Sequence, residues 1–176
     1  MAGNLEFIKS VEITSSTSSV DVTDCFSTDY DVYKITTNDF STVGTDSTQL
    51  YARYINSSGS VISASDYDIA YLNLKSNLAF GESRFTNQTS LFFQFGTIDQ
   101  SPESNGAVAY IFNPFLSSSY TFSLSQSSAM STNLLGTKHI GVLKQSASMT
   151  GIQIFEANGS RPFDSGKISV YGLASN

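Results

Sequence analysis

Residues 120–126, YTFSLSQ, alternate strictly between large and small side chains. Successive side chains of an extended chain point to opposite faces, so Phe122 and Leu124 share one face while Ser123 and Ser125 share the other. A helix would mix the two sets, because its faces repeat every 3.6 residues. The stretch therefore predicts a β-strand whose two faces meet different surroundings.

The same strand signals continue along the whole chain, whereas helical signals are nearly absent. No window of about eleven residues carries apolar side chains at helical spacing. Short alternating or apolar runs occupy residues 5–13, 19–23, 31–37, 49–55, 67–75, 89–96, 107–115, 138–145, 151–157 and 167–172. Turn residues separate these runs, among others at 56–59, 105–106, 113–114 and 158–159. The pattern predicts an all-β fold: a two-sheet antiparallel sandwich, jelly-roll-like, with about 8–11 strands.

Three of these runs also indicate their place in a sheet. TSLFFQFG (89–96) and AVAYIFNPF (107–115) are densely apolar and predict central strands that are covered on both sides. KISVYG (167–172) lies close to the end of the printed sequence, yet it alternates as clearly as any other run. We expect it to be an internal strand of a sheet, with Ile168 and Val170 in the core.

Size and charge narrow the class of protein. The 176 residues suit a single domain, in which we expect residues 1–20 to form an N-terminal strand or arm and residues 21–176 to form the β-sandwich. The net charge of −6 and the scattered Lys and Arg residues argue against nucleic-acid binding. No apolar run approaches the ~20 residues of a membrane span. The N-terminal residues lack a signal-peptide pattern, which predicts synthesis in a cytoplasm.

Side chains that could carry chemistry are few. A Cys25–His139 nucleophilic pair is conceivable, but the polar neighbours of Cys25 indicate a small half-buried residue near a strand end. One Cys and one His fall short of a zinc site. We therefore predict no catalytic residue and no enzyme activity, with a polysaccharide-degrading enzyme as the least favoured alternative.

Aspartates gather in two places along the chain. They are Asp21, Asp24, Asp29 and Asp31 in the first group and Asp66 and Asp68 in the second. Because Asp is a favoured turn residue, turn chemistry is the stronger interpretation, and calcium binding is the alternative. No cofactor is predicted.

Aromatic and apolar side chains point instead to binding. The run LEFIKSVEI (5–13) carries apolar residues on both faces, as expected where one side meets the core and the other a neighbour. Tyrosine offers a large rigid face at low entropic cost, which suits an interface or a ligand groove. The candidate interface residues are Leu5, Phe7, Ile8, Tyr30, Tyr33, Tyr51, Tyr67 and Tyr171.

Four segments carry a resemblance to a known group of proteins. FSTDYDVYKITTNDF (26–40) resembles the early strand pair of a group of phage β-sandwich domains, and FEANGSRPFDSGKISVYG (155–172) resembles their terminal hairpin. YIFNPFLSSSYTFSL (110–124) and GTKHIGVLKQSASMTGIQIFEANG (136–159) are similar to the middle of the same domains. The chain thus resembles small jelly-roll-like virion structural proteins of tailed bacteriophages that infect marine bacteria, cyanobacteria among them.

The resemblance implies a virion component and supplies no catalytic residue. The expected function is capsid decoration (a cement protein), or another particle-stabilising role, through symmetric binding to phage capsid or tail proteins. A homo-oligomer is expected, with a trimer as one option. The alternative is a tail-associated module that binds a receptor or a host-surface glycan. Longer tail-fibre proteins add an N-terminal attachment region, for which only residues 1–20 are left here. The expected location is the virion, after synthesis in the host cytoplasm.

Overall fold

The computed structural model describes residues 4–43, 48–94, 105–130, 133–156, 159 and 161–174. These residues form twelve strands, and all the pairings between them are antiparallel. The part of the chain that is described holds no helix that could span a bilayer. The predicted all-β sandwich is confirmed, with slightly more strands than expected.

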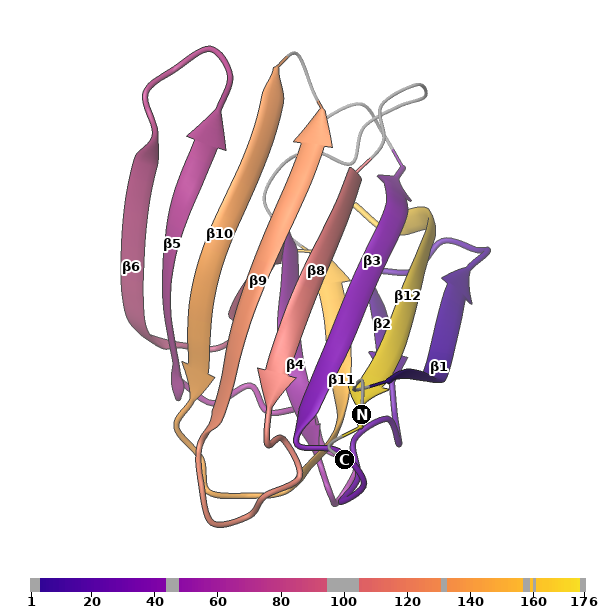
Figure 1. Cartoon of the computed structure of the whole chain (residues 1–176). Coiled ribbons are helices and arrows are strands. Elements are labelled where there is room, and N and C mark those ends of the chain that lie inside the picture. Colours follow the sequence, from indigo (N-terminus) through magenta and orange to yellow (C-terminus); the bar gives the residue numbers. More distant parts are fainter. Residues whose placement is uncertain are drawn as a thin grey trace.

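Two sheets make up the molecule (Figure 1). The large sheet has eight strands, in spatial order β1 (Leu5–Ile13), β12 (Phe163–Leu173), β3 (Val32–Thr42), β8 (Asn105–Phe112), β9 (Thr121–Met130), β10 (Leu134–Leu143), β5 (Tyr67–Lys75) and β6 (Gly81–Gln88). The small sheet has four, in order β2 (Ser19–Val22), β11 (Met149–Glu156), β4 (Leu50–Asn56) and β7 (Leu91–Gln94). Figure 1 shows the large sheet in front and the small sheet behind it.

Eight of these strands pair as in a jelly roll. β1 pairs with β12, β2 with β11, β3 with β8 and β4 with β7. The chain therefore runs out through four strands and returns through their four partners, and successive pairs alternate between the two sheets. This doubled-back path is the jelly-roll arrangement, so that part of the prediction is confirmed as well.

Two hairpins are inserted into the jelly roll. The β5–β6 hairpin lies between β4 and β7 in the chain, and the β9–β10 hairpin lies between β8 and β11. Both continue the large sheet beyond β8, in the order β9, β10, β5, β6. The large sheet is therefore twice as wide as a four-stranded jelly-roll sheet, and much of its added width comes from segments that the jelly roll itself does not need.

The closing strand lies inside the large sheet, between β1 and β3, as predicted. Ile168 and Val170 are fully buried in the core. Gly172 lies beneath the ring of Tyr30, where an added Cβ would meet ring carbon at 2.4 Å, so only glycine allows this close approach. The end of the strand is thus fixed by a pairing on each side and a ring above it.

The first two strands belong to the sandwich. β1 pairs with β12 and β2 pairs with β11, so the segment supplies one strand to each sheet. The boundary expected after residue 20 falls inside β2. Residues 5–22 are therefore part of the two sheets and form no separate arm.

The prediction that Tyr33 and Tyr67 line an interface is wrong, because both side chains are fully buried between the sheets. The Tyr33 hydroxyl accepts a hydrogen bond from the Ser27 N–H at 2.7 Å and donates one to the Ser27 carbonyl at 3.0 Å. The Tyr67 hydroxyl accepts from the Tyr54 N–H at 3.1 Å and donates to the Ile62 carbonyl at 2.9 Å. Each phenol finds its partners inside the fold, which makes its burial tolerable.

The two densely apolar runs differ from their predicted positions. β7 is an edge strand of the small sheet, although Leu91 and Phe93 are both buried. β8 is central in the large sheet, but only its inward side chains, such as Ile111, are buried. The other side of β8, which includes Phe112, is only half-buried. The expectation of cover on both sides therefore fails for β8.

Candidate interaction face on the large sheet

The outward face of the large sheet is apolar where outward faces are usually polar. On β9, Thr121 and Ser125 point inward and are buried, while Phe122 points outward and is 54% exposed. On the adjacent β10, His139 points inward and Ile140 points outward with 61% of its surface exposed. Around these residues, both strands thus reverse the common arrangement of apolar side chains inside and polar side chains outside, while Ala129 and Leu143 are buried inward and Lys138 points outward as usual.

The register of the strands aligns the outward side chains into rows. Side chains directly opposite each other on adjacent strands have Cβ atoms about 5 Å apart. From β10 to β1, one row consists of Val142, Phe122, Phe112, Val32, Leu173 and Leu5. The neighbouring row consists of Ile140, Leu124, Tyr110, Lys34, Tyr171 and Phe7. We call these two rows the apolar band, since Lys34 is their one charged member.

The band is large for an exposed apolar surface. Its most exposed members are Leu5, Phe7, Phe122, Ile140 and Leu173, with exposed fractions between 38% and 61%. Taking about 200 Å² for a fully exposed large side chain, these five present on the order of 500 Å². The half-buried members add to this area. Contiguous apolar patches of this size on soluble proteins mark binding surfaces or sites of aggregation.

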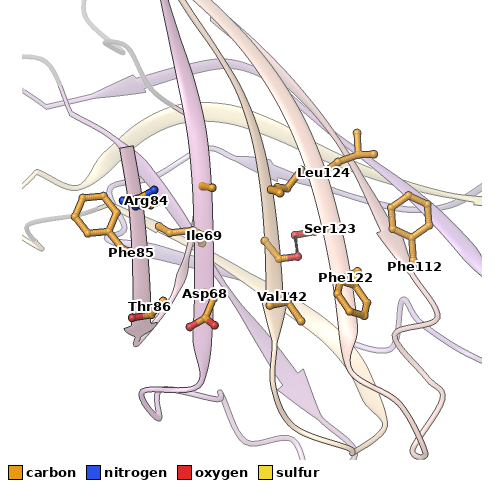
Figure 2. A pocket seen from close by; sticks show the side chains of 13 residues that line it. Asp68, Ile69, Arg84, Phe85, Thr86, Phe112, Phe122, Ser123, Leu124 and Val142 are labelled. Carbon is orange, nitrogen blue, oxygen red and sulfur yellow. Dashed lines mark hydrogen bonds between the residues drawn. The ribbon is translucent and has the colours of Figure 1, made fainter. Parts of the chain in front are cut away.

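A shallow hollow lies at one end of the band (Figure 2). It has a volume of about 600 Å³ and extends from β6 to β8. Its lining includes Ala70, Phe112, Phe122, Leu124, Ile140 and Val142. A second hollow of about 540 Å³ adjoins it and shares Ala70, Arg84 and Ile140 with it. Both are open to one side, which suits a chain laid across the face better than an enclosed small molecule.

Basic side chains border the two hollows. Arg84 on β6 and Lys138 on β10 are exposed, and neither forms a hydrogen bond or an ion pair with the described residues. Lys34 lies within the band itself. Glu82 is an acidic side chain in the lining of the second hollow. Because the chain carries a net charge of −6, these unpaired cations set the face apart from the remaining, more acidic surface.

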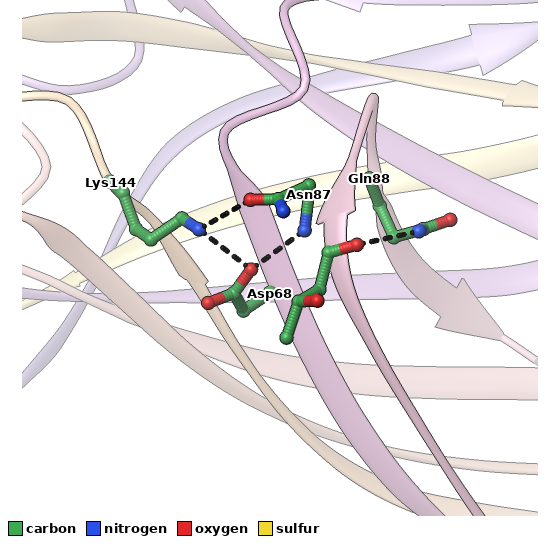
Figure 3. A network of polar contacts seen from close by, with 5 residues as sticks. Asp68, Asn87, Gln88 and Lys144 are labelled. Atoms are coloured by element: carbon green, nitrogen blue, oxygen red, sulfur yellow. Dashed lines mark hydrogen bonds and ion pairs between the residues drawn. The ribbon is translucent and has the colours of Figure 1, made fainter.

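One ion pair fixes the rim of the first hollow (Figure 3). The Lys144 ammonium lies 2.9 Å from the Asp68 carboxylate and donates a hydrogen bond to the Asn87 side-chain oxygen at 3.0 Å. The Asn87 N–H donates to the same carboxylate at 2.9 Å. The pKa of Asp68 is lowered, chiefly by the hydrogen bond from Lys144. Asp68 is thus held as a carboxylate with its own partners, whereas Arg84 in the same lining has no ion-pair partner in the part of the chain that the structure describes.

Two inward polar side chains of β9 and β10, Ser125 and His139, are hydrogen-bonded inside the molecule, whereas the buried Thr121 hydroxyl has no hydrogen-bond partner among the described residues. The Ser125 hydroxyl lies 2.7 Å from His139 Nδ1, and His139 Nε2 lies 2.9 Å from the Phe93 carbonyl. A carbonyl only accepts, so Nε2 carries the proton and Nδ1 accepts a hydrogen bond from Ser125. Burial lowers the pKa of His139 to about 4. His139 therefore links the large sheet to β7 as a neutral side chain.

The structure does not bring Cys25 and His139 together as a hydrogen-bonded pair. The Cys25 thiol donates to the Val22 carbonyl at 3.3 Å, and the Cys25 N–H donates to the Thr150 carbonyl at 2.9 Å. Burial raises the pKa of Cys25 to about 12, which keeps it a thiol rather than a thiolate. Cys25 bonds to Val22 and Thr150, whereas His139 bonds to Ser125 and Phe93, so the two side chains share no hydrogen-bond partner.

Three further aspartates of the two groups accept hydrogen bonds from side chains of the same chain. Asp21 accepts a hydrogen bond from Gln153 at 2.8 Å, and Asp66 accepts one from Gln145 at 2.7 Å. Asp29 accepts one from Ser27 at 2.9 Å. Within the described ranges, no group of three or more His, Cys, Asp and Glu side chains is placed to hold a metal ion.

Three of the predicted interface residues meet at the far end of the apolar band. Leu5, Phe7 and Tyr171 lie on β1 and β12, and the rings of Phe7 and Tyr171 pack edge to face with their centroids 5.7 Å apart. Ile8 lies at a bulge in β1 and packs against the core instead. The bulge separates Ile8 from the outward row that holds Phe7.

Tyr30 and Tyr51, the remaining candidates, lie elsewhere and are half-buried. Tyr30 covers Gly172 and donates a hydrogen bond to the Glu6 carboxylate at 2.5 Å. Tyr51 on β4 packs between Phe92 and Phe155, with centroids 5.4 and 5.9 Å away. Both rings are thus occupied mainly by contacts within the chain.

Sequence reasoning missed the centre of the face. Phe122, Ile140 and Arg84 come from three strands of the two inserted hairpins, and their alignment depends on cross-strand register. The alternation in β9 was the available signal, since it marked Phe122 as a member of a purely apolar face. Nothing in that stretch alone indicates that this face is the outward one.

Neither a family model nor a curated protein matches the sequence. Among solved structures, a fructofuranosidase from Schwanniomyces occidentalis complexed with fructosylnystose is 7% identical over 98% of this chain, with a TM-score of 0.28. The lectin UEA-II complexed with galactose is 8% identical over 94% of this chain and 99% of the lectin, with a TM-score of 0.20. The structure of infectious bursal disease virus, Gx strain, is 11% identical over 99% of this chain, with a TM-score of 0.15. This chain spans 35% of the fructofuranosidase chain and 40% of the viral chain. Likenesses this distant carry no argument about function.

Proposed function

We propose that this protein is a structural component of a bacteriophage virion, a capsid decoration or other particle-stabilising protein that acts by binding rather than by catalysis. The apolar band is the observation that carries the proposal. It presents on the order of 500 Å² of apolar surface from five side chains alone, a sizeable part of the ~800 Å² that each partner buries in a stable protein interface. A neighbouring subunit would remove this surface from water.

Two further observations support a place in a virion. Jelly rolls of this pairing recur in viral capsid domains, although they also occur in lectins, so the fold alone is only an analogy. The segments 26–40 and 155–172 that resemble phage virion proteins form β3 and β12, which lie side by side in the large sheet. A homo-oligomer around a symmetry axis of the particle is part of the proposal.

The alternative, a tail-associated module for a receptor or a host glycan, fits the face less well. Sugars are bound by aromatic rings together with convergent hydrogen-bonding groups. The centre of the first hollow is formed by Phe122, Leu124 and Ile140, and the polar groups of Asp68 at its rim are already engaged. The lining thus favours apolar side chains of a protein partner.

The test is incorporation of the chain into virions. Particles are assembled in the presence of wild-type protein or of the double variant Phe122→Ser/Ile140→Ser, purified, and analysed for occupancy by quantitative mass spectrometry. The matched control is Leu78→Ser/Leu116→Ser, because both leucines are similarly exposed, at 62% and 49%, but lie outside the band. We expect the control to be incorporated and the double variant to be lost. Absence of the wild-type chain from purified particles would contradict the proposal.

A further inference from the structure

The dimensions of the first hollow indicate what it can hold. It crosses five adjacent strands, from β6 to β8, and adjacent strands lie about 4.8 Å apart. The hollow is therefore about 19 Å long. An extended chain advances about 3.3 Å per residue, so a segment of about six residues fits its length. Such a segment would lie across the strands and would be held by its side chains, because the sheet backbone beneath it is already paired.

The floor of the hollow specifies apolar contacts. Ile140 is 61% exposed and stands between the two hollows, with Leu124 directly opposite it on β9 and Ala70 opposite it on β5. Phe122 and Val142 form the adjacent pair in the next row. In an extended segment every second side chain points to the same face, so three of six residues can reach this floor.

The charges specify the remaining side chains. Arg84 lines the first hollow without an ion-pair partner among the described residues, and Asp68 in the same lining is already paired with Lys144. Lys138 lines the adjoining second hollow, where Glu82 is the acidic side chain. An acidic segment would supply carboxylates to these cations, and the Arg84 guanidinium can hold a carboxylate through two hydrogen bonds. A second copy of the same face would bring its own arginine and lysine toward them, which disfavours face-to-face pairing of two copies.

The geometry points to one occupant: an extended, acidic segment of about six residues from a different subunit of the particle, with large apolar side chains at alternating positions. This inference rests on the proposed function, since it names the partner chemistry of the same face. Ile140 and Phe122 hold the apolar side chains, and Arg84 selects for negative charge.

The test uses a library of random seven-residue peptides, displayed on a carrier and selected on the immobilised full-length protein. The same selection is made on Arg84→Glu and on Lys167→Glu, a matched charge reversal at the polar end of the same face, opposite Glu12. Wild type and Lys167→Glu are expected to enrich Asp and Glu between apolar residues. Arg84→Glu is expected to lose this enrichment and to favour Lys and Arg.

One selected acidic peptide is then synthesised, and its dissociation constant is measured by fluorescence anisotropy. We expect binding to weaken about tenfold or more in Arg84→Glu and in Ile140→Ser, and to change less than about twofold in Lys167→Glu. Far-UV circular dichroism confirms that each variant is folded. Selected peptides without an acidic bias, or binding that survives Ile140→Ser, would overturn the inference.

Sedimentation equilibrium separates this occupant from a second copy. The mass of the wild-type protein is expected to equal that of Ile140→Ser. A wild-type oligomer that dissociates in Ile140→Ser would make the occupant a second copy and overturn the inference, while leaving a role in the virion intact. Conversely, acidic peptide binding by a chain that is absent from purified virions would overturn the proposed function and leave the peptide site standing.

Discussion

The outward faces of the two sheets differ in how their side chains are satisfied. On the small sheet, the Arg53 guanidinium lies 4.2 Å from the centre of the Phe155 ring, and its Nε donates to the Thr89 carbonyl at 3.0 Å. On the large sheet, Arg84 has no partner among the described residues, and Ile140 beside the same hollow is 61% exposed. At these positions the arginine of the small sheet is engaged within the chain, whereas the arginine of the large sheet has no hydrogen bond or ion pair of its side chain among the described residues.

This difference separates the side chains that stabilise the fold from the exposed side chains that do not. A side chain held in water adds little to the free energy of unfolding, whereas each buried polar group must be paired. On the inward side of the inserted strands β9 and β10, Ser125 and His139 meet the second requirement, while the buried Thr121 hydroxyl has no hydrogen-bond partner among the described residues. Their exposed outward apolar side chains contribute little to folding, which is consistent with the proposed binding face.

The largest effect is expected from removing β12, the closing strand of the large sheet. Deletion of residues 166–176 removes most of β12, leaves β1 and β3 without their shared partner, and takes Ile168 and Val170 from the core. The cost is several kcal/mol against a typical total of about 5–15 kcal/mol, so we expect insoluble or unfolded protein. Solubility and a circular dichroism melt measure this.

The control for this truncation is deletion of residues 1–4, which precede β1. The fold should survive that deletion with little change in melting temperature. Deletion of residues 1–13 removes β1 with the buried Ile13 and, with Leu5 and Phe7, one end of the apolar band, so it should lower the melting temperature as well as weaken incorporation into particles. A well-folded protein that lacks residues 166–176 would show that the jelly-roll framework does not depend on its closing strand.

Acid should lower the free energy of unfolding through a buried side chain of the inward face, His139. Burial holds the pKa of His139 near 4, below its ordinary value of 6.5, so the fold favours the neutral ring. The stability that this group contributes is complete above about pH 6.5 and is lost as the pH falls toward 4, up to about 3 kcal/mol. Urea unfolding between pH 7 and pH 4 should show a smaller loss for His139→Gln than for wild type. Parallel pH profiles of the two proteins would refute this assignment.

Substitutions of two adjacent residues of β10 test the inward and the outward face of the large sheet. A Cβ on Gly141 would lie 2.4 Å from Leu91 Cδ2 on β7, and Leu91 is buried and has little room to move. Gly141→Ala should therefore cost about 1–3 kcal/mol through overpacking. Ile140→Thr, on the outward side, should change the free energy of unfolding by less than about 0.5 kcal/mol. Chemical denaturation of the two variants measures both; equal costs would mean that the outward face is structural.

Much of the fold could be predicted from local pattern, because a half-buried strand repeats every two residues. The run 31–37 placed Tyr33 and Ile35 on one face, and both are fully buried. β6 could not be found in this way. Its sequence, GESRFTNQ, is mainly polar, and most of its side chains are exposed at the edge of the sheet, so no apolar period marks it.

The candidate site could be predicted only in part. The clean alternation in β9 separated two faces but did not show which face is buried. Hydroxyl groups can point inward when they find hydrogen-bond partners there. For Ser125 this partner is His139 on β10, which in turn hydrogen-bonds to the Phe93 carbonyl on β7. Tyr33 and Tyr67 were wrongly predicted as interface residues for a related reason. A tyrosine whose hydroxyl has hydrogen-bond partners inside the protein can be buried completely.

The smallest effect is expected for a pair of arginines, one on each outward face. Arg53→Ala removes the stacking on Phe155 and the hydrogen bond to the Thr89 carbonyl, for a loss of about 1 kcal/mol of unfolding free energy. Arg84→Ala removes no side-chain hydrogen bond or ion pair among the described residues and should leave stability within about 0.5 kcal/mol of wild type. Paired urea titrations at neutral pH measure the difference. If Arg84→Ala cost as much as Arg53→Ala, the Arg84 guanidinium would already be engaged within the chain, and it could not be the free charge that selects an acidic partner.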